Sequence, residues 1–310
     1  MLKKQTRPVF IGGCERSGTT FLADIIGKLD NALVVPESQF IAEVLNRRAE
    51  FSSVGEVKNH LKTSFRFMVW GVDITSLEIE DELTCSLDNL RTLFSQVVYA
   101  YSQIVGATNF DVWIDHTPSN TWYSSSLLGL YPDARFIHLV RDGRAVCNSV
   151  LELDWGPNTA IEAATWWSSR LSSGFLSEVY LGNRCIRVYY EAVIEKTDSS
   201  IDQLLSFLNM TNHARDTQSG FIVPSYTSNQ HKLVGAKPQT SRVDAWRREM
   251  SPTNIASFEK YTFDMLSMLG YEKVGLRIVG KSLLFEYCFI RPALFIKNVL
   301  RNKLRKSKII

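Results

Sequence analysis

Five short apolar runs alternate with helical segments, and this alternation limits the fold more than any other feature of the sequence. The runs are rich in β-branched and aromatic residues, which is typical of buried strands. They lie at 9–11, 33–35, 112–115, 135–140 and 186–190. Parallel strands need long crossover connections, which are usually helices. We therefore expect an α/β fold with a central parallel sheet of about five strands.

The helical segments are marked by apolar residues spaced three or four positions apart. After Thr19 such a stripe consists of Phe21, Leu22, Ile25, Ile26 and Leu29. Further helices are expected after Arg144, over 160–180 and over 197–209, the last of them capped by Thr197 or Asp198.

About seventy residues, 41–110, separate the second strand from the third, with helical periodicity that is clearest over 87–105. A plain crossover is far shorter. We expect a helical cap over the carboxyl edge of the sheet, where open α/β sheets bind ligands. The alternative is a surface decoration with no role in a site.

The formal charge of +3 divides unevenly along the chain. Residues 281–310 carry eight Lys or Arg against one acid, a net +7, and the remainder carries −4. An acidic body excludes a nucleic-acid binder, whose footprint is a basic domain. The apolar residues of the tail, with basic flanks, fit an interfacial helix on an anionic membrane. They fit equally well a last helix packed on the core and followed by a solvated end.

The cysteines and the N-terminal residues indicate the cellular compartment in which we expect the protein. The five Cys include no C-x-x-C pair and no His at metal spacing, which indicates a reducing compartment and no structural zinc. The apolar run at 8–12 is far shorter than the core of a signal peptide. We expect a cytoplasmic protein, with peripheral attachment to the inner face of a membrane as the alternative.

The first strand and first helix are joined by Gly-Gly-Cys-Glu-Arg-Ser-Gly-Thr-Thr, in which Gly13 and Gly18 have P-loop spacing. Such a loop directs backbone N–H groups at an anion on a helix N-terminus. The lysine of nucleoside triphosphatases is replaced by Thr19, and a cation stands inside the loop as Arg16. The fourth strand ends in Arg141, where metal-binding NTPases commonly carry an acid. This combination predicts a site for a phosphorylated nucleotide without a metal-bridged triphosphate.

The motifs Arg16-Ser-Gly-Thr-Thr20 and Val140-Arg-Asp-Gly-Arg-Ala-Val-Cys-Asn-Ser149 resemble the two cofactor motifs of sulfotransferases that use 3′-phosphoadenylyl sulfate (PAPS). Val188-Tyr-Tyr-Glu191 and Trp246 with Leu269-Gly-Tyr271 strengthen the resemblance, which covers about 8–275 and is closest to the tyrosylprotein and glycan sulfotransferases. It implies a three-layer α/β/α fold similar to P-loop nucleoside triphosphate hydrolases. It also implies one domain over 1–275, with 41–110 as its cap, and a C-terminal extension over 276–310.

The resemblance implies that the loop holds the 5′-phosphate, with Arg16 also stabilising charge on the leaving oxygen, and that no metal takes part. A second group would hold the 3′-phosphate and the rest of the nucleotide. The cofactor-binding residues expected in this way are Arg16, Ser17, Gly18, Thr19, Thr20, Arg141, Ser149, Tyr190, Ser228 and Lys237, with Lys232 as a further candidate in the late loop. Arg144 either adds charge to this site or is simply solvated, and we expect the latter.

Two residues compete for the role of general base, which must take a proton from the acceptor. Glu37 follows the second strand, where the tyrosylprotein and glycan branches place their catalytic glutamate. His116 follows the third strand in Ile-Asp-His-Thr-Pro, a context similar to that of the basic histidine of the cytosolic branch. We expect Glu37 to be the base and His116 to orient or polarise the sulfuryl group; the swapped roles and a purely structural His116 are the alternatives.

The acceptor is expected to be a glycan, a lipid-linked or a small molecule with a hydroxyl or amine. The residues after Glu37, Ser-Gln-Phe, lack the basic residue with which tyrosylprotein enzymes hold acidic peptides, so a tyrosine peptide is less expected. Aromatic residues in and beside the cap could stack on a sugar or could simply be core. They are Phe65, Phe67, Trp70, Tyr99, Tyr101, Trp122 and Tyr123.

Two other functions stay open: a degenerate P-loop kinase or NTPase with Asp115 as Mg²⁺ ligand, and a nucleotide-binding protein without catalysis.

Overall fold

In the computed structural model of the chain, the residues described are 6–275 without 30, 108, 154, 211–239 and 263, together with 293 and 296. The chain divides into two compact units. The first comprises residues 1–139 and 173–238, and the second comprises 140–172 and 239–310. The C-terminal extension lies almost entirely outside the described residues.

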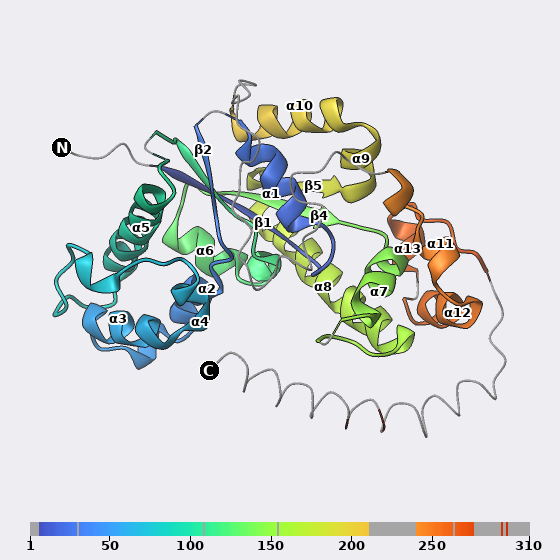
Figure 1. The fold of residues 1–310 in the computed structure, drawn as a ribbon, viewed down its shortest axis with the longest axis horizontal. Coiled ribbons are helices and arrows are strands. Elements are labelled where there is room, and N and C mark those ends of the chain that lie inside the picture. Colours follow the sequence, from blue (N-terminus) through green and yellow to red (C-terminus); the bar gives the residue numbers. More distant parts are fainter. Residues whose placement is uncertain are drawn as a thin grey trace. The chain divides into compact units, whose positions relative to one another are not determined.

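A five-stranded sheet occupies the centre of the fold, in the order β2-β3-β1-β4-β5 (Figure 1). The strands are β1 (Arg7–Gly13), β2 (Ala32–Val35), β3 (Val112–Asp115), β4 (Arg135–Val140) and β5 (Cys185–Tyr189). β1 pairs in parallel with β3 and β4, and β2 pairs in parallel with β3. The expected α/β fold with a central parallel sheet is confirmed.

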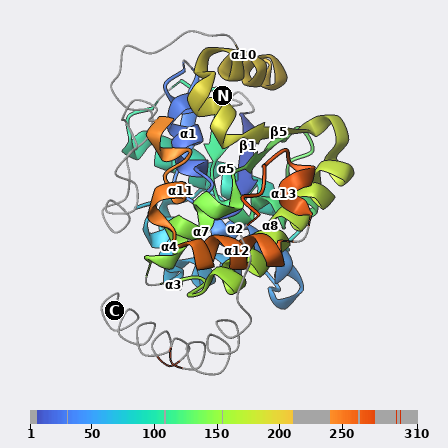
Figure 2. The same ribbon diagram turned by 90° about the vertical axis from the view of Figure 1, so that its right-hand side faces the viewer.

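Helices cover both faces of the sheet, which gives the expected α/β/α layers. Figures 1 and 2 show α1, α9 and α10 on one face and α5, α6 and the C-terminal half of α8 on the other. The longer helices are α1 (Thr19–Gly27), α2 (Gln39–Asn46), α3 (Val54–Thr63), α5 (Leu87–Ile104), α6 (Ser124–Leu130), α7 (Gly143–Leu151), α8 (Ala160–Leu181), α10 (Thr197–Leu208) and α12 (Pro252–Tyr261). The short ones are α4 (Phe65–Met68), α9 (Tyr190–Glu195), α11 (Trp246–Glu249) and α13 (Met265–Met268).

Serine caps explain where three of the helices begin. Ser53, Ser86 and Ser251 precede α3, α5 and α12, and each side chain accepts a hydrogen bond from the backbone N–H three residues later. The cap expected for α10 is wrong. Lys196 occupies its N-cap position without a side-chain cap, and Thr197 is already helical, with its hydroxyl donating to the carbonyl oxygen of Val193 at 2.8 Å.

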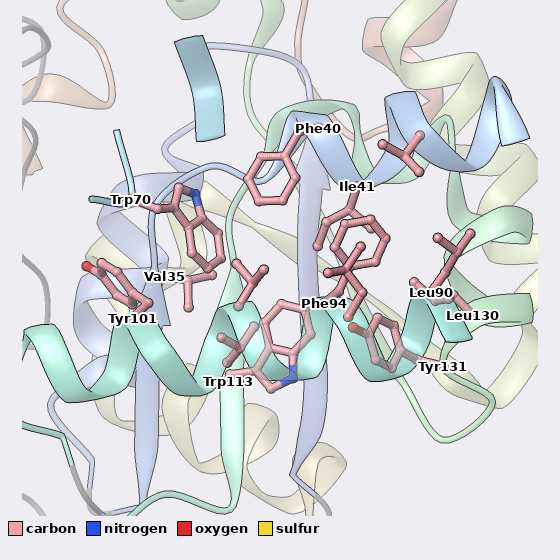
Figure 3. Packing of buried hydrophobic residues seen from close by; sticks show 14 of the residues in the cluster. Val35, Phe40, Ile41, Trp70, Leu90, Phe94, Tyr101, Trp113, Leu130 and Tyr131 are labelled. Atoms are coloured by element: carbon pink, nitrogen blue, oxygen red, sulfur yellow. The ribbon is translucent and has the colours of Figure 1, made fainter. Parts of the chain in front are cut away.

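The residues between β2 and β3 are helical, as expected, and they share one hydrophobic core with the sheet. Figure 3 shows this core, in which Phe40 of α2 and Trp70 pack with residues of β3 and α5. The rings of Phe40 and Trp70 lie 5.3 Å apart, and those of Trp70 and Tyr101 lie 5.2 Å apart. Removing the insertion would therefore expose much of one face of the sheet.

None of the helices in the described part of the chain combines the length and apolar character that a membrane span requires.

Candidate active site

The glycine loop joins β1 to α1 in a conformation that few side chains allow. Arg16 has φ 71° and Gly18 has φ 98°, both in the left-handed region. A non-glycine residue there is uncommon, and such strain gathers at functional sites. A Cβ atom on Gly18 would lie 2.7 Å from Cδ2 of Tyr190, so both the backbone and the space require glycine. A larger residue at position 18 would therefore distort the loop.

The polar groups of the loop suit a phosphate. Ser17 is buried, and its hydroxyl has no hydrogen-bond partner among the described residues. Leaving a buried polar group unsatisfied costs about 1–3 kcal/mol, which a ligand oxygen would recover. Thr19 and Thr20 form the buried start of α1, where the helix dipole favours an anion. Arg16 is half-buried beside them.

The ring of Tyr190 packs against this loop at Gly18. Tyr190 is buried, and its ring lies 6.0 Å from that of Phe21 on α1, between centroids. The strand was expected to reach residue 190, but β5 ends at Tyr189, and Tyr190 is the first residue of α9. Its ring therefore packs against the loop from the start of a helix.

Glu37 lies two residues beyond the end of β2 and is mostly buried, with 22% of its side chain exposed. Burial raises the pKa of Glu37 to about 7, and the negative charges of Asp115 and Glu15 act in the same direction. The guanidinium of Arg66 opposes this effect, with Nη1 3.4 Å from Glu37 Oε2. Gln39 Nε2 donates to the same oxygen at 3.1 Å. A carboxylate with a pKa near neutrality is suited to general-base catalysis.

Asp115 ties the loop that carries Glu37 to the loop that carries His116. Its Oδ1 accepts from the backbone N–H and the hydroxyl of Thr117, at 2.9 and 2.6 Å, and its Oδ2 accepts from the hydroxyl of Ser38. The backbone N–H of Ser38 donates to Thr117 Oγ1 at 2.8 Å. Both carboxylate oxygens are thus engaged within the protein, which argues against Asp115 as an Mg²⁺ ligand.

His116 lies beside the glycine loop. It is buried, and its Nδ1 is 3.4 Å from Thr20 Oγ1, within hydrogen-bond distance. β1 and β3 are neighbours, and Val35 of β2 pairs with Asp115 of β3, so the three loops leave the sheet at one edge. The first unit therefore brings together Glu37, His116 and the loop around Gly18 at one edge of the sheet.

Arg141 and Ser149 belong to the second unit. Arg141 follows β4, and its Nη2 lies 3.5 Å from the carbonyl oxygen of Arg242. Ser149 lies on α7 and is half-buried. Their role toward the 3′-phosphate stays a prediction. Ser228, Lys232 and Lys237 lie outside the described residues.

Arg144 is not solvated, and the expectation that it would be is wrong. Its side chain is 1% exposed and forms ion pairs with Asp142 at 2.8 Å and with Glu259 at 2.7 Å. The guanidinium also stacks on Trp246, 4.0 Å from the ring centroid, and donates to the carbonyl oxygen of Glu272 at 2.7 Å. Arg144 therefore holds the second unit together.

Arg66 and Thr117 contribute to the site but carry no signal in the sequence. Arg66 is one arginine in a helical stretch and lies 29 positions from Glu37, and Thr117 is unremarkable beside His116. No spacing rule connects either residue to the base. Among the described residues, no group of three or more His, Cys, Asp or Glu is placed to hold a metal.

The chain is similar in sequence to proteins named as protein-tyrosine sulfotransferases. It is 22% identical over 261 residues to a candidate protein-tyrosine sulfotransferase of Caenorhabditis briggsae, covering 82% of this chain and 78% of that protein. It is 23% identical over 214 residues to protein-tyrosine sulfotransferase 2 of Gallus gallus, covering 67% of this chain and only 52% of that protein.

Solved structures show the same fold. The sulfotransferase domain of the curacin biosynthetic pathway matches with a TM-score of 0.53 and 15% identity, covering 87% of this chain and 99% of that domain. The sulfotransferase domain of a Synechococcus olefin synthase matches with a TM-score of 0.52 and 20% identity, covering 86% and 98%. The model of the sulfotransferase family matches residues 8–214. The chain therefore belongs to the sulfotransferase family.

Proposed function

We propose that this sulfotransferase moves the sulfuryl group of PAPS in line to a hydroxyl or amine of an acceptor, with Glu37 as general base. The observation that carries the proposal is the grouping of Glu37, His116 and the glycine loop at one edge of the sheet, within one unit. PAPS, when bound, supplies the sulfuryl group and a nucleotide phosphate as the leaving group.

The residues of this chain have distinct tasks in such a transfer. The buried Ser17 hydroxyl and the start of α1 bind the 5′-phosphate, and Arg16 neutralises charge that develops on the leaving oxygen. Glu37 removes the proton of the acceptor at its carboxylate. His116, next to Thr20, orients the sulfuryl group. Arg141 and Ser149 bind the 3′-phosphate. No metal is needed, because the phosphates are met by cationic and hydrogen-bonding groups.

The acceptor class that we propose is a glycan, a lipid-linked molecule or a small molecule. Three aromatic residues support it, since Phe65, Tyr99 and Trp122 are exposed by more than a third and could contact an acceptor. A protein tyrosine is the second candidate, favoured by the names of the relatives in Caenorhabditis briggsae and Gallus gallus. Screening hydroxyl and amine compounds, glycans and tyrosine peptides with sulfate-labelled PAPS decides between them.

Thermal unfolding with nucleotides tests the proposed donor. A ligand that binds only the native state raises the melting temperature. We expect 3′,5′-diphosphoadenosine to raise it by several degrees without Mg²⁺, and ATP with Mg²⁺ to have a smaller effect. Replacing Arg16 by Met should reduce the shift, whereas Arg47→Met, at an exposed position, should not. Stabilisation by ATP that depends on Mg²⁺ would favour a kinase or NTPase, and no response to the diphosphate would refute the proposed donor.

The pH dependence of the reaction tests the role of Glu37. A base must be unprotonated, and the pKa of Glu37 is raised to about 7. We expect kcat/KM to rise about tenfold per pH unit below pH 7 and to level off above it. The measurement is sulfuryl transfer from PAPS at saturating donor and low acceptor. A rate that does not change with pH across this range would contradict the assignment.

A further inference from the structure

We propose that Arg66 of α4 is a positioning residue for Glu37, through which the helical insertion controls the aim and the ionisation of the base. This role presupposes the function proposed above and names a residue that the sequence did not single out. It gives the insertion a direct part in the chemistry, in addition to its part in the hydrophobic core.

The contacts of the Glu37 carboxylate are asymmetric. Arg66 Nη1 lies 3.4 Å from Oε2, and Gln39 Nε2 donates to the same Oε2 at 3.1 Å. Among the described residues, neither a hydrogen bond nor an ion pair falls on Oε1. The hydrogen bond from Gln39 and the ion pair with Arg66 fall on the same oxygen and together favour one rotation of the carboxylate about its last bond. Oε1 is then the atom that receives the proton of the acceptor.

The backbone that follows Arg66 is held by two buried residues, Phe67 and Trp70. Phe67, the next residue, is 3% exposed, and its ring lies 5.3 Å from that of Phe40 in an edge-to-face arrangement. Trp70 is 1% exposed, packs on Phe40, and donates from Nε1 to the backbone oxygen of Glu37 at 3.4 Å. Figure 3 shows Trp70 between Phe40 and Tyr101. The backbone that carries Arg66 is therefore anchored in the core, and its guanidinium does not have to be ordered by the ion pair alone.

The charges around Glu37 make Arg66 important for the reactive form of the base. Burial raises the pKa of Glu37, Arg66 lowers it, and Asp115 at the end of β3 and Glu15 of the glycine loop raise it further. Gln39 of α2 is neutral. Without Arg66, two acids and a poorly solvated environment would keep Glu37 protonated at neutral pH. The insertion thus supplies the charge that allows the base to ionise.

A carboxyl titration tests this role without requiring an acceptor. The full-length chain, labelled with ¹³C at the glutamate carboxyl carbons, would be titrated by NMR, and Glu37→Gln would identify the signal of Glu37. We expect a pKa of about 7 in the unaltered protein. Arg66→Met should raise it by about one unit or more. Arg66→Lys should restore most of the difference, because it keeps the charge. Arg47→Met is the matched control, since Arg47 pairs with Glu43 and Glu50 on the surface.

The outcomes separate this role from a structural one and from the proposed function. An unchanged titration of Glu37 in Arg66→Met, or an equal shift in Arg47→Met, would overturn the role of Arg66. If Arg66→Met does not fold, Arg66→Lys and the neutral variant Arg66→Gln replace it. The role of Arg66 would then be overturned if the pKa of Glu37 in Arg66→Lys equalled that in Arg66→Gln instead of that in the unaltered protein. We expect binding of 3′,5′-diphosphoadenosine to be unaffected by Arg66→Met, because Arg66 is not among the residues expected to hold the nucleotide. A failure of the donor proposal therefore appears in the thermal test and not in this titration.

Discussion

Replacing Glu37 by glutamine is expected to reduce sulfuryl transfer about 10²–10⁴-fold, the usual contribution of a general base. Glutamine keeps the size of the side chain and its hydrogen bonding to Gln39, but it cannot accept the proton of the acceptor. The measurement is the transfer of labelled sulfate from PAPS at about pH 8, where the base is ionised. Binding of 3′,5′-diphosphoadenosine should be unchanged, because Glu37 is not among the residues expected to hold the nucleotide.

Loss of stability cannot explain such a result. Because the folded state raises the pKa of Glu37 to about 7, the native protein binds this proton more tightly than the unfolded chain does. The favourable contribution of Glu37 to the free energy of unfolding is therefore complete below its ordinary pKa and is lost as the pH rises through 7. At pH 8 the buried charge destabilises the native state, so Glu37→Gln should melt at the same temperature or higher.

Glu43→Gln is the matched control for this substitution, since Glu43 lies on α2, and 44% of its side chain is exposed. It should keep full activity. An active Glu37→Gln protein would refute Glu37 as the base and would transfer that role to His116, which His116→Gln could then test by the same assay.

Replacing Arg144 by methionine is expected to destabilise the protein by about 3–5 kcal/mol, because it leaves buried carboxylates without their cation. The side chains of Asp142 and Glu259 are only 8% and 6% exposed, and both pair with this guanidinium. Glu259 also accepts from the backbone N–H of Val274 and of Gly275, at 2.8 and 3.1 Å. The substitution should therefore loosen residues 272–275 as well.

Thermal unfolding and hydrogen exchange measure this effect. The melting temperature should fall by on the order of 10 °C. Exchange should accelerate in α7 and α12 of the second unit before it does in the sheet. Arg247→Met provides the control, because Arg247 stacks on the same Trp246 at 4.5 Å, but 49% of its side chain is exposed. We expect a loss below about 1 kcal/mol there. Equal losses in the two variants would show that stacking, and not the buried ion pairs, stabilises this region.

The sequence predicted the sheet and the glycine loop because both are encoded by short, continuous stretches. Each strand is one apolar run, and the loop lies between β1 and α1 with its two glycines at fixed spacing. The predicted strands agree with the structure to within two residues at each end. The same reasoning failed for Arg144, whose solvation depends on Glu259, 115 positions away. No local pattern distinguishes an arginine that will be buried from one that will be exposed.

Two further errors have local causes. Thr197 resembles a capping residue, but α9 ends at Glu195, only two positions before it, and the Thr197 hydroxyl donates to the carbonyl oxygen of Val193 in that helix. Tyr190 has the residue type of a strand, yet the chain turns into α9 at this position. In both cases a neighbouring helix, and not the preference of the residue itself, decided the conformation.

By itself, the sequence determined the α/β fold, the family and the candidates for base and phosphate ligands, because periodicity and motifs of adjacent residues are sufficient for each. Only the tertiary structure decided how those candidates are tuned. The pKa of Glu37, the engagement of Asp115 with Ser38 and Thr117, and the ion pairs of Arg144 all depend on desolvation and on charges from distant segments. Arg66 is the clearest case, since an arginine 29 residues from the base acts on it only because α4 packs into the core beside α2.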